Sequence, residues 1–238
     1  TLLAGKTGWY AVGVLGVLLL LSVGTGVYLW WPRNNAFGKA LTFKRGAAAA
    51  RINFDIHKLA GSYGALVLMS LAVSGLWLIF PDFIRPIVAS VSPVNQSVAP
   101  SYRPPEGVQS VLPEPGGSIN PDRAVAMAKK IFPNAEVRWV ITPEGDKGVY
   151  GVQMRQPSEA NHFNPATMVW VDRYTGTILA TRDPERFTLG ETLLNVMWPL
   201  HSGEALGLPG RILICLTGFA SLVLYVTGLI RRRQKRRA

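Results

Sequence analysis

Three histidines are the residues of this sequence whose type and position point to chemistry. His57 stands just before an uncharged stretch at 59–80, and His201 stands about ten residues before another at 212–230. Histidine is a common axial ligand of haem iron, and an ionisable side chain near membrane depth is a candidate functional residue. For His57 and His201 the alternative is a polar side chain that snorkels to the membrane surface. His162 lies in the polar segment NHFNPA, where we expect a surface or structural role.

Glycines follow both membrane-edge histidines at short intervals. Gly61 and Gly64 lie four and seven residues after His57, on the same face if the segment is helical. His201 is followed by Gly203, Gly207 and Gly210. These glycines indicate either clearance for a flat macrocycle beside its axial ligand or close helix–helix packing. The single cysteine, Cys215, excludes Cys-x-x-Cys-His attachment, so a haem bound here would be of b type. Cys215 itself falls within an apolar stretch, where we expect it to pack as a small apolar residue.

Three segments without any charged residue must position these histidines: 9–31, 59–80 and 212–230. Each is long enough as a helix to cross a hydrocarbon core of about 30 Å at about 1.5 Å per residue. The sequence therefore predicts a multi-pass membrane protein, with a lipid bilayer as its surroundings.

The distribution of charge predicts the orientation. The tail 231–237 and the loop 32–58 each hold six basic residues, and Asp55 is the one acid among them, so this side carries +11. The remaining basic and acidic residues cancel. The positive-inside rule then places loop, tail and C-terminus in the cytoplasm of a bacterial inner-membrane protein, and the segment between the second and third spans in the periplasm. The basic tail is thus explained by topology and anionic lipid, and we expect no nucleic-acid partner.

The periplasmic segment has the pattern of a small α+β domain. A linker rich in Pro, Ser and Gly covers 92–117, and a helix capped by Asn120 or Ser118 is predicted over 121–131, with Val125, Ala128 and Ile131 on one face. Strands are predicted at 136–142, 149–155, 168–172 and 177–181, with Val137, Trp139 and Ile141 on one side of the first. An amphipathic segment, 187–200, then leads to His201 along the membrane surface.

An internal repeat links the first and last spans. Gly5, Gly8, Gly16 and Thr25-Gly26 recur 202 residues later as Gly207, Gly210, Gly218 and Thr227-Gly228. His201 would then correspond to a position two residues before Thr1, where we predict a histidine in a longer protein. The chain begins with Thr at the head of a span and shows no signal-peptide pattern, so we expect further sequence, including a fourth helix, upstream.

The motifs resemble the PepSY-associated transmembrane family. The matching segments are FDIHKLAGSYGALVLMSLAVSGLWLIFP at 54–81, TGVYLWWPR at 25–33, and PLHSGEALGLPGRI with VTGLIRRR in the last span. Between them, PDRAVAMAKKIFP and VWVDRYTGTILA are similar to a PepSY domain. The implied fold is an all-α membrane bundle with an inserted, small α+β periplasmic domain. Its parts are helices and loop at 1–91, the linker at 92–117, the PepSY-like domain at 118–186 and the last span with its tail at 187–238.

The resemblance implies a transmembrane ferric-siderophore reductase that serves iron uptake. Electrons from a cytoplasmic donor would pass through two b-type haems, ligated by His57 and His201, to a periplasmic ferric siderophore or other ferric chelate. Because these histidines are predicted on opposite faces of the membrane, they cannot ligate one haem together, and upstream sequence would supply the second axial ligands. The candidate contacts to the haem propionates are Arg51, Lys58, Arg45 and Arg211, for which lipid headgroups are the alternative.

Two other functions fit parts of the sequence. A membrane-tethered PepSY module that binds a partner or inhibits a protease would need no haem. A siderophore transporter is weaker, because uncharged spans offer no charged residue to line a pore. Trp77, Trp198 and Tyr225 could contact a haem edge, although interface anchoring or helix packing is their ordinary role.

Overall fold

The structure is a computed structural model that describes residues 5–32, 36–96, 98, 103–111, 117–159, 161–162 and 164–237. The chain divides into two compact units. The helical unit comprises residues 1–80 and 200–238, and the α+β unit comprises residues 81–199. Each unit is described by itself below.

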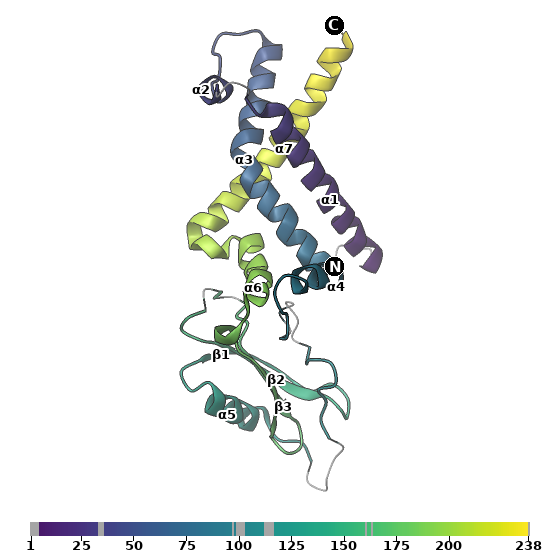
Figure 1. The fold of residues 1–238 in the computed structure, drawn as a ribbon, viewed down its shortest axis with the longest axis vertical. Helices are drawn as coiled ribbons and strands as arrows, with labels where there is room; N and C mark the ends of the chain where they lie inside the picture. Colours follow the sequence, from purple (N-terminus) through teal and green to yellow (C-terminus); the bar gives the residue numbers. More distant parts are fainter. Residues whose placement is uncertain are drawn as a thin grey trace. The chain divides into compact units, whose positions relative to one another are not determined.

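Among its described residues, the helical unit contains three helices long and apolar enough to cross a membrane: α1 (Gly5–Trp30), α3 (Ala49–Ile79) and α7 (Gly207–Arg237). They match the predicted spans, of which 9–31 and 59–80 end one residue beyond α1 and α3, and α3 packs against both α1 and α7 (Figure 1). The short α2 (Phe37–Ala40) lies between α1 and α3. Helix α3 begins ten residues before its uncharged stretch, so the last part of the predicted loop 32–58 is helical and carries His57.

Close packing of α1 on α3 depends on a small residue. A methyl group added at Gly13 would overlap the ring of Phe80, and one added at Gly16 would lie 3.4 Å from Leu76. Near the same end, the indole Nε1 of Trp9 donates a hydrogen bond of 3.2 Å to the carbonyl oxygen of Ile79. Small residues allow such backbone approach in membrane helices, where dispersion and hydrogen bonds replace the hydrophobic effect.

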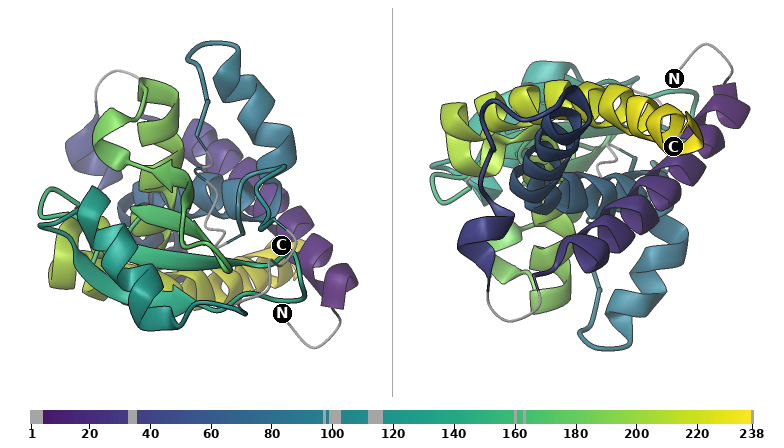
Figure 2. Two further views of the ribbon diagram at one scale, coloured as in Figure 1. Left: turned by 90° about the horizontal axis from the view of Figure 1, so that it is seen from below. Right: turned by 90° about the horizontal axis from the view of Figure 1, so that it is seen from above.

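The α+β unit is built on a four-stranded antiparallel sheet in the order β1-β2-β3-β4. The strands are β1 (Glu136–Ile141), β2 (Val149–Arg155), β3 (Met168–Asp172) and β4 (Ile178–Arg182), each close to its predicted range. Helix α5 (Pro121–Ile131) covers one face of this sheet (Figure 2). It begins where predicted because the side chain of Asn120 accepts a hydrogen bond of 2.9 Å from the amide of Arg123.

Two predicted side-chain faces are wrong in detail. The register of β1 shifts between Val137 and Trp139, so Val137 packs with α5 while Ile141 packs on the other face and Trp139 is 59 % exposed. A bulge of this kind reverses the alternation that a regular strand would keep. On α5, Ala124 and Ala128 are fully buried, whereas Ile131 is 45 % exposed, because the buried face is centred on the two alanines.

The β3–β4 turn accounts physically for the VDRYTG motif. Asp172 Oδ1 accepts hydrogen bonds of 2.8 Å from the amides of Tyr174 and Thr175, and Gly176 adopts a positive φ of 76°. Asp172 Oδ2 accepts a bond of 3.0 Å from the amide of Val111. This last contact ties the preceding segment to the sheet. The described part of the predicted linker 92–117 therefore contributes to the α+β unit.

A buried carboxylate holds the chain where α6 (Leu189–Ser202) begins, after α4 (Pro81–Ala89) and the short η2 (Pro184–Arg186). Glu191 is 1 % exposed; one of its oxygens accepts hydrogen bonds of 2.7 and 2.6 Å from the amides of Asn95 and Gln96. The other oxygen accepts a bond of 2.8 Å from the amide of Thr188, whose hydroxyl accepts from the amide of Glu191. This is a capping box. Helix α6 occupies the predicted amphipathic segment and ends at His201 and Ser202, before η3 (Glu204–Leu206).

Candidate functional site

His57 lies on α3, in the part of the helix that faces α7. Its Nδ1 is 2.8 Å from the hydroxyl oxygen of Thr227. One turn away, the amide side chain of Asn53 donates a hydrogen bond of 3.0 Å to the carbonyl oxygen of Thr227. A Cβ added at Gly228 would lie 3.6 Å from Cε1 of His57, which is ordinary contact. The imidazole is thus held against the Thr227-Gly228 step of α7.

His201 is held in the same way by α3. Its Nδ1 is 3.1 Å from the hydroxyl oxygen of Ser74, which is fully buried. A Cβ added at Gly75 would lie 3.1 Å from Cε1 and 3.6 Å from Nδ1 of the same ring. Both histidines therefore contact a hydroxyl residue followed by glycine on the neighbouring helix.

The two histidine sites lie far apart within the helical unit. His57 and Ser74 are both on α3, and their separation of 17 positions corresponds to about 25 Å of helix at about 1.5 Å per residue. One cofactor cannot contact both imidazoles across this distance. His162 belongs to the α+β unit, where it is exposed and its Nε2 lies 3.4 Å from Nη2 of Arg155, in agreement with the expected surface role.

The glycines that follow the histidines serve packing. Added Cβ atoms at Gly61 and Gly64 would lie 3.6 Å from Leu224 and 4.0 Å from Ala220, so these two glycines face α7. Gly203 and Gly210 approach each other with their backbones, and Gly207 has a positive φ of 62° where α7 begins. The interpretation as macrocycle clearance receives no support from these contacts. The glycines in contact with the imidazoles are Gly75 and Gly228.

Two of the basic residues predicted to meet propionates, Arg51 and Lys58, are engaged within the chain. Asp55 is fully buried, and its carboxylate pairs with Arg51 at 3.2 Å and with Lys58 at 3.1 Å. The backbone amide of Lys44 also donates to Asp55, at 3.2 Å. These contacts fasten the loop after α2 to α3. A propionate at Arg51 or Lys58 would have to compete with this carboxylate.

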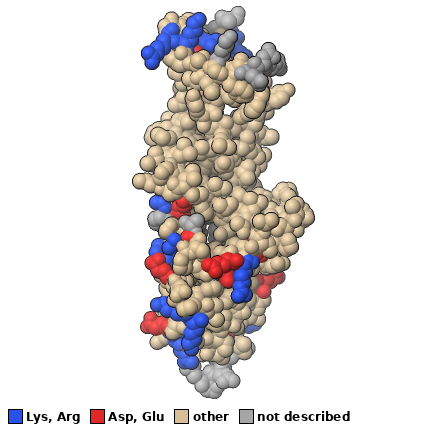
Figure 3. All heavy atoms as spheres, turned by 60° about the vertical axis from the view of Figure 1, so that its left-hand side comes forward, with Lys and Arg blue, Asp and Glu red and all other residues tan. Residues whose placement is uncertain are grey.

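The other predicted cations have different surroundings. Arg211 pairs with Glu204 at 2.9 Å, and Arg45 is exposed. The guanidinium of Arg231 lies 4.3 Å from the ring centroid of Phe54, one helical turn after Thr227, and forms no ion pair with a described residue. On the face drawn in Figure 3, Lys and Arg gather at the end of the helical unit that holds the C-terminal tail, and no charged side chain lies over the middle of its helices.

The remaining candidates for haem-edge contact differ in burial. Trp77 is 2 % exposed, Trp198 is half-buried, and Tyr225 is 66 % exposed on α7. Cys215, expected to pack as a small apolar residue, is exposed on α7. In the part of the chain that the structure describes, no three His, Cys, Asp or Glu side chains cluster to hold a metal ion directly. A single neutral imidazole at each end does fit one axial ligand of a haem.

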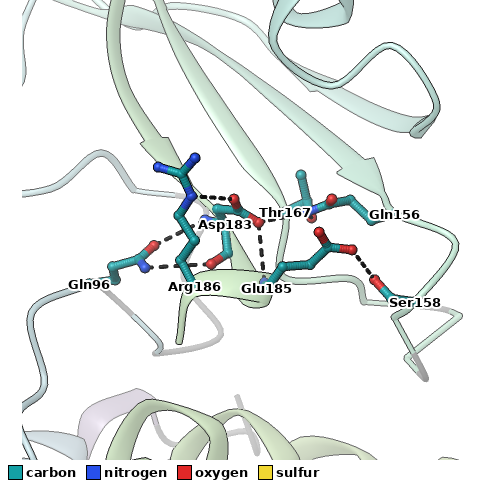
Figure 4. A network of polar contacts seen from close by, with 7 residues as sticks. All are labelled: Gln96, Gln156, Ser158, Thr167, Asp183, Glu185 and Arg186. Atoms are coloured by element: carbon teal, nitrogen blue, oxygen red, sulfur yellow. Dashed lines mark hydrogen bonds and ion pairs between the residues drawn. The ribbon is translucent and has the colours of Figure 1, made fainter. Parts of the chain in front are cut away.

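The α+β unit contains a cavity of about 480 Å³. Its border includes a polar network in which Asp183 accepts hydrogen bonds from Gln156 at 2.8 Å and from the amide of Glu185 at 3.2 Å, and pairs with Arg186 at 3.4 Å (Figure 4). Ser158 donates a bond of 2.6 Å to Glu185. These polar groups are bonded to one another, so the network stabilises the wall of the cavity.

Sequence reasoning missed the partners of the histidines. Ser74 and Gly75 were not singled out, and Thr227-Gly228 was noted only as part of a repeat. A signal does exist, because a hydroxyl residue followed by glycine recurs late in each apolar stretch: Thr25-Gly26, Ser74-Gly75 and Thr227-Gly228. At the first of these, no described residue lies within 4 Å of a Cβ added to Gly26.

The chain is similar to a known family over almost its whole length. The model of the family described as the PepSY-associated TM region matches residues 1–235, nearly the whole chain. No curated protein matches the sequence. The match includes both histidine sites and the α+β unit between them, so the chain belongs to the PepSY-associated transmembrane family.

Proposed function

We propose that this protein is a haem-containing oxidoreductase of the bacterial inner membrane. It passes electrons from a cytoplasmic donor to ferric iron held by a periplasmic siderophore or similar chelate. The observation that carries the proposal is the pair of histidine sites. Two imidazoles lie about 25 Å apart along α3, near opposite ends of an apolar helical unit, and each is fixed by a hydroxyl group of the neighbouring helix.

We assign a separate role to each residue of the two sites. His57 and His201 each provide one axial ligand, and a bound haem b would supply a reversible one-electron iron couple at each end. Arg231 is the cation that we assign to a propionate beside His57, because Arg51 and Lys58 are paired with Asp55. The apolar helices exclude water and ions between the two sites, so charge crosses as electrons only.

The substrate step is a one-electron reduction. Ferric iron in the chelate gains an electron and becomes ferrous iron, which hard oxygen ligands hold less tightly. The positive-inside rule places the Arg231 end in the cytoplasm, so His57 would be on the donor side and His201 on the substrate side. Arg211 and Glu204, which form an ion pair at 2.9 Å, lie close to His201 in the sequence, on the same side.

Visible absorbance of the purified full-length protein tests this proposal. We expect the Soret band and the dithionite-reduced α band of haem b in the unmodified protein. His57→Ala and His201→Ala should each lose about half of the haem, because each removes one of two independent sites. His162→Ala is the matched control and should retain all of it, since His162 lies in the other unit. A colourless protein, or haem that survives both substitutions combined, would refute the proposal.

A membrane-tethered binding module remains the second candidate. The observation that favours it is the cavity of about 480 Å³ in the α+β unit, which lies away from both membrane histidines in the sequence. A protein of this kind binds its partner without haem. The absorbance measurement described above therefore distinguishes the two functions. Partner binding that is unaffected by His57→Ala and His201→Ala would favour the binding module.

A further inference from the structure

We propose that the hydroxyls of Thr227 and Ser74 fix the tautomers of His57 and His201, so that each neutral imidazole carries its proton on Nδ1 and keeps Nε2 as the lone-pair nitrogen. The two hydroxyl residues are positioning residues in this scheme. The use of Nε2 as a haem ligand rests on the proposed function. The assignment of the tautomers rests on the contacts alone.

The first step concerns the single proton of each hydroxyl. The hydroxyl of Thr227 lies 2.6 Å from the carbonyl oxygen of Val223, and that of Ser74 lies 2.6 Å from the carbonyl oxygen of Ser70. A carbonyl oxygen can only accept, so the hydroxyl proton must lie in this short contact. If the proton pointed to the histidine instead, two acceptor oxygens would face each other at 2.6 Å without a proton between them.

The second step concerns the imidazole. Once its proton is used, a hydroxyl oxygen has only lone pairs to offer its other neighbour. The contacts of 2.8 Å between Thr227 and His57 Nδ1 and of 3.1 Å between Ser74 and His201 Nδ1 therefore require a proton on Nδ1. A neutral imidazole protonated there has an unprotonated Nε2, which is the form that binds a metal.

The third step concerns space. Gly75 and Gly228 follow the two hydroxyl residues, and an added Cβ would lie 3.1 Å from Cε1 of His201 or 3.6 Å from Cε1 of His57. The Nδ1–Cε1 edge of each ring therefore lies against a glycine of the neighbouring helix. The hydroxyl and the glycine act together, since the glycine admits the ring and the hydroxyl fixes its proton.

Helix α3 takes part in both sites. Helix α3 carries His57 and supplies Ser74 to His201, while α7, which follows His201, supplies Thr227 to His57. The same chemical solution thus occurs twice, about 25 Å apart, from different residues. Hydrogen bonds of this kind at the non-ligating nitrogen orient metal-binding histidines and raise their basicity.

Nitrogen NMR of the full chain, labelled with ¹⁵N-histidine and kept free of haem in detergent micelles, tests the assignment. We expect His57 and His201 to show a protonated Nδ1 and a lone-pair Nε2, the opposite of the tautomer that free histidine favours in water. Exposed His162 should report tautomer exchange and serves as the internal reference. Protonation of Nε2 in the unmodified protein at either membrane histidine would overturn the proposal without any variant.

Variants add the causal test. Thr227→Val keeps the side-chain shape but removes the hydroxyl, so the His57 signals should become those of a mixture while the His201 signals stay unchanged. Thr227→Ser keeps a hydroxyl and should retain the single tautomer of His57. In the same way, Ser74→Ala should give a mixture of tautomers at His201, and Ser74→Thr should retain the single tautomer. Unchanged histidine signals in Thr227→Val and Ser74→Ala would contradict the assignment.

The haem-loaded protein gives a second readout. Removing the hydroxyl should weaken haem binding at that site by about 10–100-fold, as is typical for the hydrogen-bond partners of metal ligands. Loss of haem at the other site instead would also contradict the scheme. A colourless protein with the expected tautomers would refute the proposed function and leave the tautomer assignment intact, so the two failures are distinguishable.

Discussion

An alanine at position 75 is the sharpest single perturbation of the His201 site. The new Cβ would lie 3.1 Å from Cε1 of His201. Carbon atoms in contact prefer about 3.5–4.0 Å, so the ring must retreat by roughly half an ångström. Its hydrogen bond to Ser74 is 3.1 Å long and has little room to lengthen. Overpacking of this kind costs about 1–3 kcal/mol.

Gly228→Ala is the matched control, because the same methyl group there would meet His57 at 3.6 Å, an ordinary contact. Both glycines lie within helices, so the gain of about 0.5–1 kcal/mol from the better helix former is shared. The difference between the two variants then isolates the contact with the histidine.

Thermal unfolding of both variants in detergent measures this difference. At about 2–4 °C per kcal/mol for a chain of this size, Gly75→Ala should melt about 2–12 °C below Gly228→Ala. The His201 tautomer signals should broaden or move in Gly75→Ala alone. Equal melting temperatures with unchanged His201 signals would refute the reasoning that Gly75 exists to admit this ring.

Three further outcomes concern packing and buried carboxylates. Gly13→Leu should lower the melting temperature by separating α1 from α3, since even a methyl group there overlaps Phe80; Gly24→Leu, with no described residue within 4 Å, should not. In hydrogen–deuterium exchange measured by mass spectrometry, Glu191→Gln should speed the exchange of the backbone amides that donate hydrogen bonds to Glu191 by about 10–100-fold. The reason is the loss of one hydrogen bond to a charged group, which is worth about 1.5–3 kcal/mol. Unchanged exchange of these amides would contradict the stabilising role of the Glu191 carboxylate. Below about pH 4, amide hydrogen exchange in β3 should rise in the unmodified protein. The rise should be smaller in Asp172→Asn, which has no carboxylate to protonate at this position.

The pH dependence has a definite sign. Burial alone would raise the pKa of Glu191 and of Asp172, but backbone N–H groups that point at each carboxylate outweigh it and leave both pKa values below their usual range. The carboxylates therefore stabilise the fold fully above the unfolded-state pKa of about 4, and the stabilisation is lost as pH falls through the lower folded-state values.

Local patterns predicted the local structure well. The cap at Asn120 and the alternation of the strands depend on neighbouring residues, and both predictions hold apart from the bulge after Val137. Hydropathy located the apolar cores of the spans but not where α3 begins, because a helix can continue into polar residues. The start of α3 matters, since it converts Arg51, Asp55 and Lys58 from loop residues into neighbours on a helix.

The residues that contact the two histidines could not be predicted from the sequence. Ser74 contacts a histidine 127 residues away, and Thr227 contacts one 170 residues away. No local periodicity reports such pairs, and a hydroxyl residue inside an apolar helix ordinarily bonds its own backbone. Ser74 and Thr227 do so as well, and it is this backbone bond that leaves the lone pair for the imidazole.

The His57 site takes its histidine from α3 and its hydroxyl from α7, so it depends on the packing of these two helices. Between them, Gly61 and Gly64 pack against Leu224 and Ala220 and set how far one helix is displaced along the other. A slide of one residue is about 1.5 Å, enough to lengthen a hydrogen bond of 2.8 Å beyond its range. Because α3 holds His57 and α7 holds Thr227, such a slide would release the His57 imidazole. The small residues Gly61 and Gly64 therefore hold the His57 imidazole in place through the packing of the two helices, although their added Cβ atoms would not meet it.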